Sequence, residues 1–367
     1  MKQRIVVRHV LPVGRTSAVD IVIEDGYIRR IAEAGTVEGE DGFDGRGMYV
    51  SSGWIDMHVH AFSEFQPYGD DTDEIGVKQG VTVIVDAGSC GADRIADLAA
   101  HSGKAKTKVF AFLNISSIGL ERVDELSNPE WIRRDKAAEA VRMFPDFIVG
   151  LKARMSRSVV KDSGIRPLVL ARLMSDETSL PLMVHIGSAP PRVEEVLGLL
   201  EKNDIVTHYL HGKANSLFTD DGKPKPELLS AVRRGVKLDV GHGTASFSFR
   251  TAEYAKACGI SFDTISTDIY RGNRLRGPVF SLASVLTKFL HLGYSLEDVI
   301  GAVTAKPAEW LGRPELGRIQ EGDKANLTLF ALKRGRAVLV DSEGERREAD
   351  ISLQPKGAIV DGEFIEC

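Results

Sequence analysis

Gly53-Trp54-Ile55-Asp56-Met57-His58-Val59-His60 closes an apolar run with two histidines that are separated by one residue. Alternate residues of a β-strand point to the same face of a sheet, so we expect His58 and His60 to lie side by side. Two adjacent imidazoles form half of a binding site for a divalent transition metal. A single His-x-His pair does not establish such a site, and the rest of the chain has to supply further ligands.

Seven more apolar runs follow this one, and each is long enough for a buried strand. They lie at residues 82–86, 108–113, 147–152, 181–185, 204–208, 236–240 and 263–268. Helical patterns separate most of them, as at residues 191–202 and 226–234. Eight alternating strand–helix units predict an α/β fold, a (β/α)8 TIM-like barrel over residues 53–317.

The two ends of the chain have a different pattern, with short β-rich runs separated by turns such as Glu24-Asp25-Gly26. These runs lie at residues 5–7, 18–23 and 27–31, and again at 325–330, 337–340 and 358–362. Each set is too short to be stable alone, so we expect both to combine into one small β-sandwich domain, residues 1–52 and 318–367. This part shows no chemical motif, and its expected role is to brace the barrel or an oligomer contact.

The composition is that of a globular chain, with 43% hydrophobic and 27% charged residues. A formal net charge of -5 and the lack of a basic stripe argue against nucleic acid as a partner. Cys90, Cys258 and Cys367 are too few for a disulfide framework, which favours a cytoplasmic protein. The first residues lack the apolar core of a signal peptide, and no apolar run approaches the roughly 20 residues that span a membrane. We therefore expect a small-molecule substrate and no nucleic-acid or membrane partner, and we leave homo-oligomerisation open.

Polar side chains with metal-binding chemistry stand at the ends of the predicted strands. Besides His58 and His60, they are Lys152, His185, His208 and Asp268. The carboxyl ends of parallel barrel strands meet at one mouth, so these six side chains can share a site. Four imidazoles, one carboxylate and one lysine make a suitable donor set for two zinc-like ions.

Lys152 is the unusual member of this set, because an ammonium group has no lone pair to donate. Its neutral amine becomes a ligand if it reacts with carbon dioxide to form an anionic carbamate, and burial beside cations favours the neutral amine. Each residue also has an ordinary structural interpretation: a lysine with a buried stem, core histidines at His185 and His208, and a helix N-cap at Asp268. The joint pattern favours the metal site.

Four further residues are candidate substrate contacts at the mouth: Arg154, His211, His242 and Tyr270. Arg154 can hold a substrate carboxylate with its planar guanidinium, or it can form a structural ion pair at the rim of the barrel. His211 and His242 are interpreted as contacts either to substrate or to water near the metals. Tyr270 follows the last predicted strand, which places it at the mouth.

Several segments resemble the metal-dependent amidohydrolase superfamily. They are residues 53–60, 150–154, 184–185, 207–208 and 266–268, together with 302–308, 316–319 and 322–327 near the end of the chain. Residues 86–89, 151–156 and 239–243 resemble the amidohydrolase/deacetylase branch, which is related to the dihydroorotases. The resemblance covers nearly the whole chain, and the order of the ligands is its most specific feature. Tyr209-Leu210-His211-Gly212 departs from the family pattern, which affects the expected substrate contacts and not the metals.

The resemblance implies a binuclear metal centre, with zinc as the expected metal. By that resemblance His58, His60 and Asp268 would hold the more buried ion, and His185 and His208 would hold the more exposed one. Lys152, carboxylated on its side-chain nitrogen, would bridge the two. The two ions would generate hydroxide from a shared water, and Asp268 would accept its proton and return it to the leaving atom.

The resemblance also implies the reaction, which is removal of an acetyl or other acyl group from a small carboxylate-bearing amide or ester. One alternative is the opening of a cyclic amide, as in dihydroorotases and hydantoinases. Another is a metal-free scaffold without catalytic activity, which the presence of all six candidate ligands disfavours.

Overall fold

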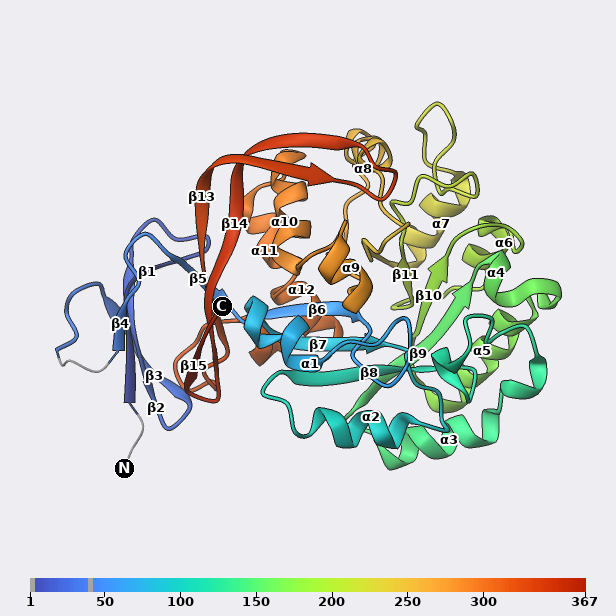
Figure 1. The fold of residues 1–367 in the computed structure, drawn as a ribbon, viewed down its shortest axis with the longest axis horizontal. Helices are drawn as coiled ribbons and strands as arrows, with labels where there is room; N and C mark the ends of the chain where they lie inside the picture. The colour runs from blue at the N-terminus through green and yellow to red at the C-terminus, as the bar shows by residue number, and fades with distance from the viewer. Residues whose placement is uncertain (1–3, 39–41) are drawn as a thin grey trace.

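The computed structural model describes residues 4–38 and 42–367, which form a barrel and a smaller sheet (Figure 1). Residues 1–3, on which the expectation about a signal peptide partly rests, lie outside the described residues. Among the described helices, none combines the length and the apolar character that a membrane span requires. Cys90, Cys258 and Cys367 are free thiols.

A seven-stranded parallel sheet forms most of the barrel, in the order β12-β11-β10-β9-β8-β7-β6. Its strands are β6 (Trp54–Val59), β7 (Val81–Ala87), β8 (Lys108–Asn114), β9 (Ile148–Met155), β10 (Leu182–Ile186), β11 (Ile205–Thr207) and β12 (Lys237–Asp239). Every residue of β6 and β7 is buried, as expected for parallel strands that are covered on both faces. Each of the seven overlaps a strand that the apolar runs predict.

The eighth predicted strand, at residues 263–268, closes the barrel without forming a regular strand. It makes a parallel bridge to β12 between Asp239 and Thr264, and the chain just after it makes one to β6 between Val59 and Ile269. Asp268 has a left-handed backbone, with a φ of 51°, which strand residues avoid. The predicted TIM-like barrel is therefore confirmed, and the prediction of a regular closing strand is corrected.

Helices surround the barrel strands (Figure 1). The α-helices are α1 (Thr72–Ile75), α2 (Ile95–Ser102), α3 (Arg134–Met143), α4 (Arg157–Val160), α5 (Arg166–Thr178), α6 (Val193–Gly198), α7 (Pro226–Arg234), α8 (Phe249–Ala257), α9 (Arg271–Arg276), α10 (Leu282–His291), α11 (Leu296–Gly301) and α12 (Ala305–Trp310). The 3-10 helices are η1 (Val77–Gln79), η2 (Gly119–Glu121), η3 (Pro129–Trp131), η4 (Lys161–Ser163) and η5 (Pro314–Gly317). Helix α7 matches its predicted bounds, because Pro226 suits its first position and Gly235, with a φ of 92°, ends it. Helix α6 is shorter than the predicted helix at residues 191–202.

Both chain ends form one mixed sheet, whose order is β15-β14-β13-β5-β1-β2-β3, with β4 paired to β1. Its strands are β1 (Arg4–Pro12), β2 (Val19–Glu24), β3 (Tyr27–Glu33), β4 (Gly42–Asp44), β5 (Tyr49–Ser52), β13 (Leu327–Val340), β14 (Arg346–Val360) and β15 (Glu363–Glu366). A bulge at His9, whose φ is 56°, interrupts β1, which pairs with both β2 and β5. Apolar side chains from the two chain ends pack in one cluster, among them Ile21, Val50 and Leu327. The predicted pairing of the ends is therefore confirmed, and the domain boundaries at residues 52 and 318 stay predictions.

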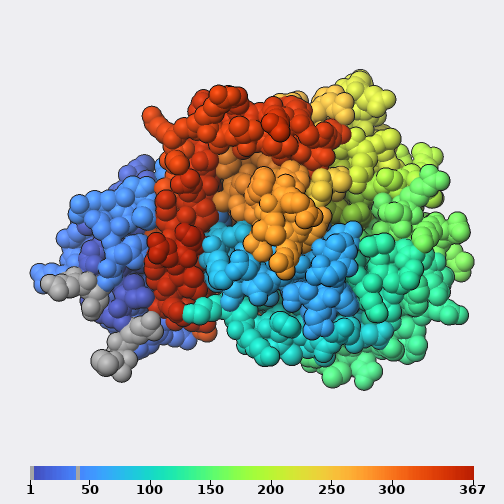
Figure 2. Space-filling model, in the orientation of Figure 1, coloured from blue at the N-terminus to red at the C-terminus, as the bar shows by residue number. Residues whose placement is uncertain are grey.

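Strands β13 and β14 form a long hairpin that leaves the small sheet and crosses to the barrel, where it lies against helix α10 (Figure 1). In Figure 2 the hairpin is the red band next to the orange part of the surface. The sequence predicts two separate strands, at residues 325–330 and 337–340. They are instead one strand, because the exposed residues 333–336 continue β13 through a bulge at Gly335, whose φ is 135°. Leu339 and Leu353, farther along the hairpin, pack on the core of the barrel.

Candidate metal centre

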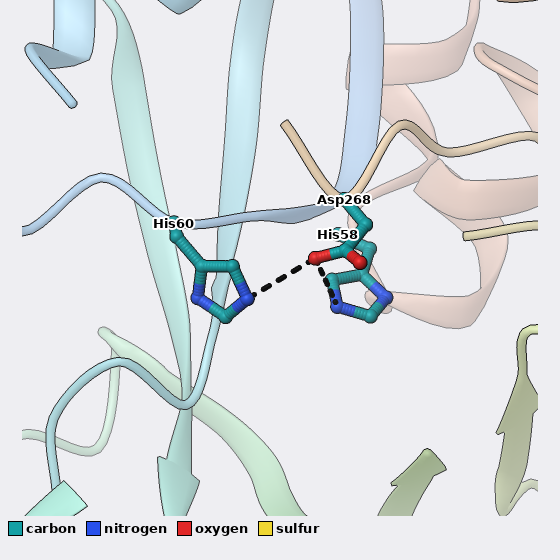
Figure 3. A group of neighbouring side chains, drawn as sticks. All are labelled: His58, His60 and Asp268. Carbon is teal, nitrogen blue, oxygen red and sulfur yellow. Dashed lines mark ion pairs between the residues drawn. The ribbon is translucent and has the colours of Figure 1, made fainter. Parts of the chain in front are cut away.

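Three side chains from two segments of the barrel converge in a compact group (Figure 3). His58 and His60 stand at the end of β6, and Asp268 comes from the segment that closes the barrel. Oδ1 of Asp268 lies 3.4 Å from Nε2 of His58 and 3.2 Å from Nε2 of His60. The candidate ligand atoms all lie within 4.8 Å of one another. Two imidazoles and a carboxylate at this spacing are donors that a zinc-like ion accepts.

Hydrogen bonds lock the end of β6 to the closing segment. The amide of Asp268 donates to the carbonyl of His58 at 2.6 Å. The carboxylate of Asp56 accepts hydrogen bonds from the amide and the hydroxyl of Thr267, at 3.0 and 2.5 Å. Burial raises the pKa of Asp56 to about 7. These bonds fix the left-handed Asp268 opposite the two histidines.

The outer ring nitrogen of His58 is held by a hydroxyl and a buried carboxylate. Nδ1 of His58 lies 2.9 Å from Oγ1 of Thr207, whose own hydroxyl donates to Oδ2 of Asp239 at 2.7 Å. Asp239 also accepts from the hydroxyls of Thr264 and Ser266, at 2.6 and 2.7 Å. Because the Thr207 proton lies on the bond to Asp239, Nδ1 of His58 must donate to Thr207. The lone pair of Nε2 therefore faces the metal-binding group.

His60 is oriented in a similar way by a serine. Its Nδ1 lies 2.9 Å from Oγ of Ser89, and the amide of Ser89 donates to Asp86 at 2.7 Å. Neither Asp86 nor Asp239 was predicted as a site residue. Both lie at or near the end of a barrel strand, which is the signal that could have identified them.

The protonation states of the group suit a metal ion. Burial lowers the pKa of His58 to about 4, so this imidazole is neutral at pH 7. Burial alone would raise the pKa of Asp268, but the interactions of this carboxyl with His58 and His60 outweigh burial and hold its pKa well below its usual range. Neutral imidazole and ionised carboxylate are the forms that bind a metal.

The other three predicted ligands lie beside this group. The ring centre of His208 lies 5.0 Å from that of His58 and 4.4 Å from that of His185. Nε2 of His208 lies 3.9 Å from Oδ2 of Asp268, and Nζ of Lys152 lies 3.1 Å from Nε2 of His58. The structure thus brings all six predicted ligands together, although they come from five segments of the barrel.

His208 provides a direct test of whether these residues fit a metal. Its Nε2 is buried and has no hydrogen-bond partner among the described residues. Its Nδ1 lies 2.6 Å from the carbonyl of Gly241, to which it must donate, so Nε2 carries an unprotonated lone pair. Buried acceptors are normally satisfied. A metal ion is a partner that fits this lone pair.

Lys152 has the surroundings that a carbamate requires. Its side chain is fully buried, and Nζ donates to Sδ of Met183 at 3.4 Å. Burial lowers the pKa of Lys152 to about 7, so a large fraction of the amine is neutral at pH 7. A Cβ on Gly88 would lie 2.6 Å from Cβ of Lys152, so only glycine leaves room for the stem of the lysine.

Comparison with known proteins agrees with this geometry. A family model for a deacetylase-like composite domain matches residues 319–365. A deacetylase of Enterococcus faecalis is 43% identical over 322 residues, which cover 87% of each chain. This chain belongs to the deacetylase family of the amidohydrolase superfamily. The superfamily that the sequence motifs predict is thereby confirmed.

Two solved structures extend the likeness over the whole length of this amidohydrolase. One, of an adenine deaminase, is 40% identical, covers 99% of both chains and has a TM-score of 0.94. The other, of a dihydroorotase, is 33% identical, covers 99% of this chain and 98% of that chain, and has a TM-score of 0.92. The barrel and the sheet built from both chain ends are therefore shared with members of the superfamily.

Arg154 of this amidohydrolase is held by a buried carboxylate. Its Nε and Nη2 each donate to Glu125 at 2.7 Å, and Nη2 also donates to the carbonyl of Val123 at 2.9 Å. The guanidinium lies over the ring of Tyr68, 5.7 Å from its centre. Of the two interpretations that the sequence allows, the structure shows the ion pair. Nη1 bonds to neither Glu125 nor Val123.

Two tyrosines stand next to the metal-binding group. The ring of Tyr68 lies 5.9 Å from that of His60 and 5.3 Å from that of Tyr270, between ring centres. Oη of Tyr270 lies 2.9 Å from Oγ1 of Thr244. Tyr270 was predicted at the mouth, and its contact with substrate stays a prediction. Tyr68 was not predicted, because it lies in a loop well beyond the end of β6.

His242 has a different place from the one that we expected. Its Nδ1 donates to the carbonyl of Gly243 at 2.9 Å, and its Nε2 accepts from Nζ of the buried Lys288 at 2.7 Å. Its ring stacks on Phe247, with 4.6 Å between the ring centres. Both ring nitrogens are satisfied inside the protein, so the expected substrate contact is corrected to a packing role.

His211 remains a candidate for contact with substrate. It is buried, and its Nδ1 accepts the amide of Lys213 at 3.2 Å. Its Nε2 has no hydrogen-bond partner within the described part of the chain. Burial lowers the pKa of His211 to about 3, so the ring is neutral at pH 7.

Proposed function

We propose that this protein is a binuclear metal-dependent hydrolase that removes an acetyl or other acyl group from a small carboxylate-bearing amide or ester. The orphaned, buried Nε2 of His208 carries the proposal, because its lone pair needs a partner that the described chain does not supply. His185 lies beside it as a further candidate ligand, and Lys152 lies beside Nε2 of His58. The similarity to a deacetylase of Enterococcus faecalis supports the class of reaction.

Five of the six candidate ligands divide into two sets. His58, His60 and Asp268 would hold one ion, and His185 and His208 would hold the other, with zinc as the proposed metal. Lys152, carboxylated on its side-chain nitrogen, would connect the two. When bound, the ions would supply a hydroxide nucleophile from water and polarise the carbonyl under attack.

Asp268 is the proposed general base and acid. Its carboxylate is ionised, since the neighbouring histidines hold its pKa low against the effect of burial. Oδ1 faces His58 and His60, which leaves Oδ2 to accept a proton from the attacking water. The same oxygen would return that proton to the leaving nitrogen or oxygen.

A cation at the mouth supports an anionic substrate. Lys213 is half-buried on the loop that carries His208 and His211, and it forms no ion pair with any described residue. Burial lowers the pKa of Lys213, and the carboxylate of Asp268 opposes this shift, so the ammonium lies within electrostatic range of the metal-binding group. A substrate carboxylate would supply the counter-charge that Lys213 lacks. Arg154, whose Nε and Nη2 are held by Glu125, could contribute only through Nη1.

A cyclic amide is the second candidate substrate, and the similarity to a dihydroorotase at 33% identity favours it. The similarity to an adenine deaminase at 40% identity adds a third hydrolytic reaction to be tested. The three reactions differ in product: acetate, a ring-opened acid, or ammonia. Product analysis therefore separates them.

The test is a product-resolved panel on protein supplied with zinc and bicarbonate. Acetylated amino and hydroxy acids of both hands, dihydroorotate, a hydantoin and adenine are offered one at a time. We expect acetate release from a carboxylate-bearing substrate, and roughly two zinc ions per chain by metal analysis. Ring opening or ammonia release without acetate would overturn the deacetylase assignment. Protein that binds no metal and hydrolyses nothing would be the non-catalytic scaffold.

A further inference from the structure

The tip of the β13–β14 hairpin is bonded to the loop that joins β12 to α8. The amide of Ser342 donates to the carbonyl of Phe247 at 3.0 Å, and the amide of Phe247 donates to Oγ of Ser342 at 3.2 Å. The hydroxyl of Ser342 donates to the carbonyl of Gly243, also at 3.0 Å. One serine thus holds both halves of a loop that lies almost 100 residues earlier in the sequence.

The part of the loop that Ser342 holds lies against Asp268. Gly243 has a φ of 54°, and its amide donates to the carbonyl of Thr267 at 2.9 Å. A Cβ on Gly243 would lie 2.5 Å from Oδ2 of Asp268, so the loop backbone is in direct contact with this oxygen. The next residue, Thr244, bonds to Tyr270. The loop is therefore the wall beside the oxygen to which we assign proton transfer.

Two acidic residues anchor the tip. Oδ2 of the buried Asp341 accepts a hydrogen bond from the amide of Phe249, the first residue of α8, at 3.0 Å. The side chain of Ser248, the N-cap residue of α8, makes no capping hydrogen bond, so Asp341 caps the helix in its place. Oδ1 of Asp341 accepts the amides of Glu343 and Glu345, at 2.9 Å each, which closes the turn. Oε2 of Glu343 accepts the hydroxyl of Ser248 at 2.7 Å. The tip is thus held together by its own hydrogen bonds and bonded to the start of α8.

The same tip also meets the loop that follows β11. The amide of Ser248 donates to the carbonyl of Leu210 at 3.0 Å, and a Cβ on Gly212 would lie 2.1 Å from Oε1 of Glu343. The middle of the hairpin, at residues 333–336, is exposed. If the β13–β14 hairpin served only to brace the small sheet, it would not need to reach the mouth of the barrel and bond to the barrel loops there.

We propose that Ser342 is a positioning residue of the active site, which acts through Gly243 to hold Asp268 in place for proton transfer. The inference rests on the proposed function, in which Asp268 is the general base. Without the hydroxyl of Ser342, the carbonyl of Gly243 loses one of its two donors and keeps only Nδ1 of His242. The amide of Phe247 loses its acceptor. The loop can then move away from Asp268, while the four histidines keep their places.

The test compares Ser342→Ala and Ser342→Thr with the wild type on any substrate that the protein hydrolyses. We expect Ser342→Ala to lower kcat about tenfold, with KM, Tm and zinc content at saturating zinc unchanged, and Ser342→Thr to restore kcat. Hydrogen exchange at the amide of Phe247 should quicken in Ser342→Ala alone. Glu345→Gln is the matched control, because the exposed side chain of Glu345 bonds, among the described residues, only to the half-buried Arg347 at the start of β14.

Three outcomes would overturn the inference. In the first, the exchange of the Phe247 amide quickens while kcat stays that of the wild type. In the second, KM rises while kcat does not change. In the third, Tm and zinc content fall in step with kcat, which would make the role of Ser342 merely structural.

A failure of the proposed function would be distinguishable from a failure of this inference. If the wild type hydrolyses nothing, the proposed function fails, and zinc affinity still tests the hairpin because Asp268 is one of the candidate ligands. Competition with a chelator should then show about tenfold weaker zinc binding in Ser342→Ala. Equal affinity in the two proteins would overturn the positioning role.

Discussion

Oγ1 of Thr207 lies 2.9 Å from Nδ1 of His58, while Nε2 of the same ring faces Asp268. The hydroxyl of Thr207 donates to Asp239, so it can only accept from His58. Thr207 thereby selects the tautomer of His58 whose Nε2 lone pair is available to a metal ion. Thr207 is not a candidate metal ligand, but its hydrogen bond sets the tautomer of His58, which is a candidate ligand.

Replacing Thr207 with valine keeps the shape of the side chain and removes the hydroxyl. We expect zinc affinity to fall about tenfold, because His58 loses the partner that fixes its tautomer and Asp239 loses a donor. Competition with a fluorescent zinc chelator measures the change. Thr36→Val, at an exposed position after β3, serves as the control. Equal affinity in all three proteins would contradict the role of Thr207.

Asp268→Asn tests the general base separately from the metal. The amide keeps an oxygen as a ligand but cannot take up a proton, so we expect kcat to fall about a thousandfold. Zinc content at saturating metal should stay that of the wild type. Metal analysis and product release are measured on the same preparation. A metal-loaded variant that turns over at the wild-type rate would exclude this role.

Lys152→Met keeps a buried chain of similar length and removes the amine. We expect bound zinc to fall from about two ions per chain to about one, and bicarbonate to lose its effect on activity, because no carbamate can form. Lys333→Met, at an exposed position of β13, is the control and should keep both ions. Wild-type zinc content in the Lys152 variant would show that the lysine is not a ligand.

The strand ends are the part of the site that the sequence could predict. His58, His185 and Lys152 belong to apolar runs, and parallel barrel strands bring the ends of such runs to one mouth. Asp239 obeys the same rule. It is not singled out because one aspartate after an apolar run is also common at ordinary strand ends, and only its three hydroxyl partners show what it does.

Partners that lie on distant loops and helices could not be predicted. Glu125 reaches Arg154 from a loop 29 residues earlier, and Lys288 reaches His242 from a helix 46 residues later. Neither of these two contacts leaves a periodic signal in the sequence, because each depends on how whole helices and loops pack against the barrel. As a result the sequence left the partner of Arg154 open and placed His242 at the substrate.

Lys213→Met tests whether Lys213 recognises a negative charge on the substrate. We expect KM for a carboxylate-bearing substrate to rise about tenfold with kcat unchanged, because the variant loses one charged contact in binding. The same substrate with its carboxylate converted to a primary amide should keep its KM. Lys223→Met, at an exposed position nearby, is the control. An equal rise in KM for the neutral analogue would contradict a role in charge recognition.

Lys288, which bonds to His242 in the loop between β12 and α8, should make the free energy of unfolding depend on pH. Burial lowers the pKa of Lys288 to about 7, against about 10.4 for a lysine in an unfolded chain. Between these values the unfolded state binds more protons than the folded state, so the free energy of unfolding rises with pH. We expect the wild type to gain about 2 kcal/mol relative to Lys288→Met between pH 7 and pH 9. Chemical denaturation at pH 7, 8 and 9 measures this difference, and Lys333→Met should follow the wild type. Parallel curves for the wild type and Lys288→Met would show that Lys288 keeps its ordinary pKa in the folded protein.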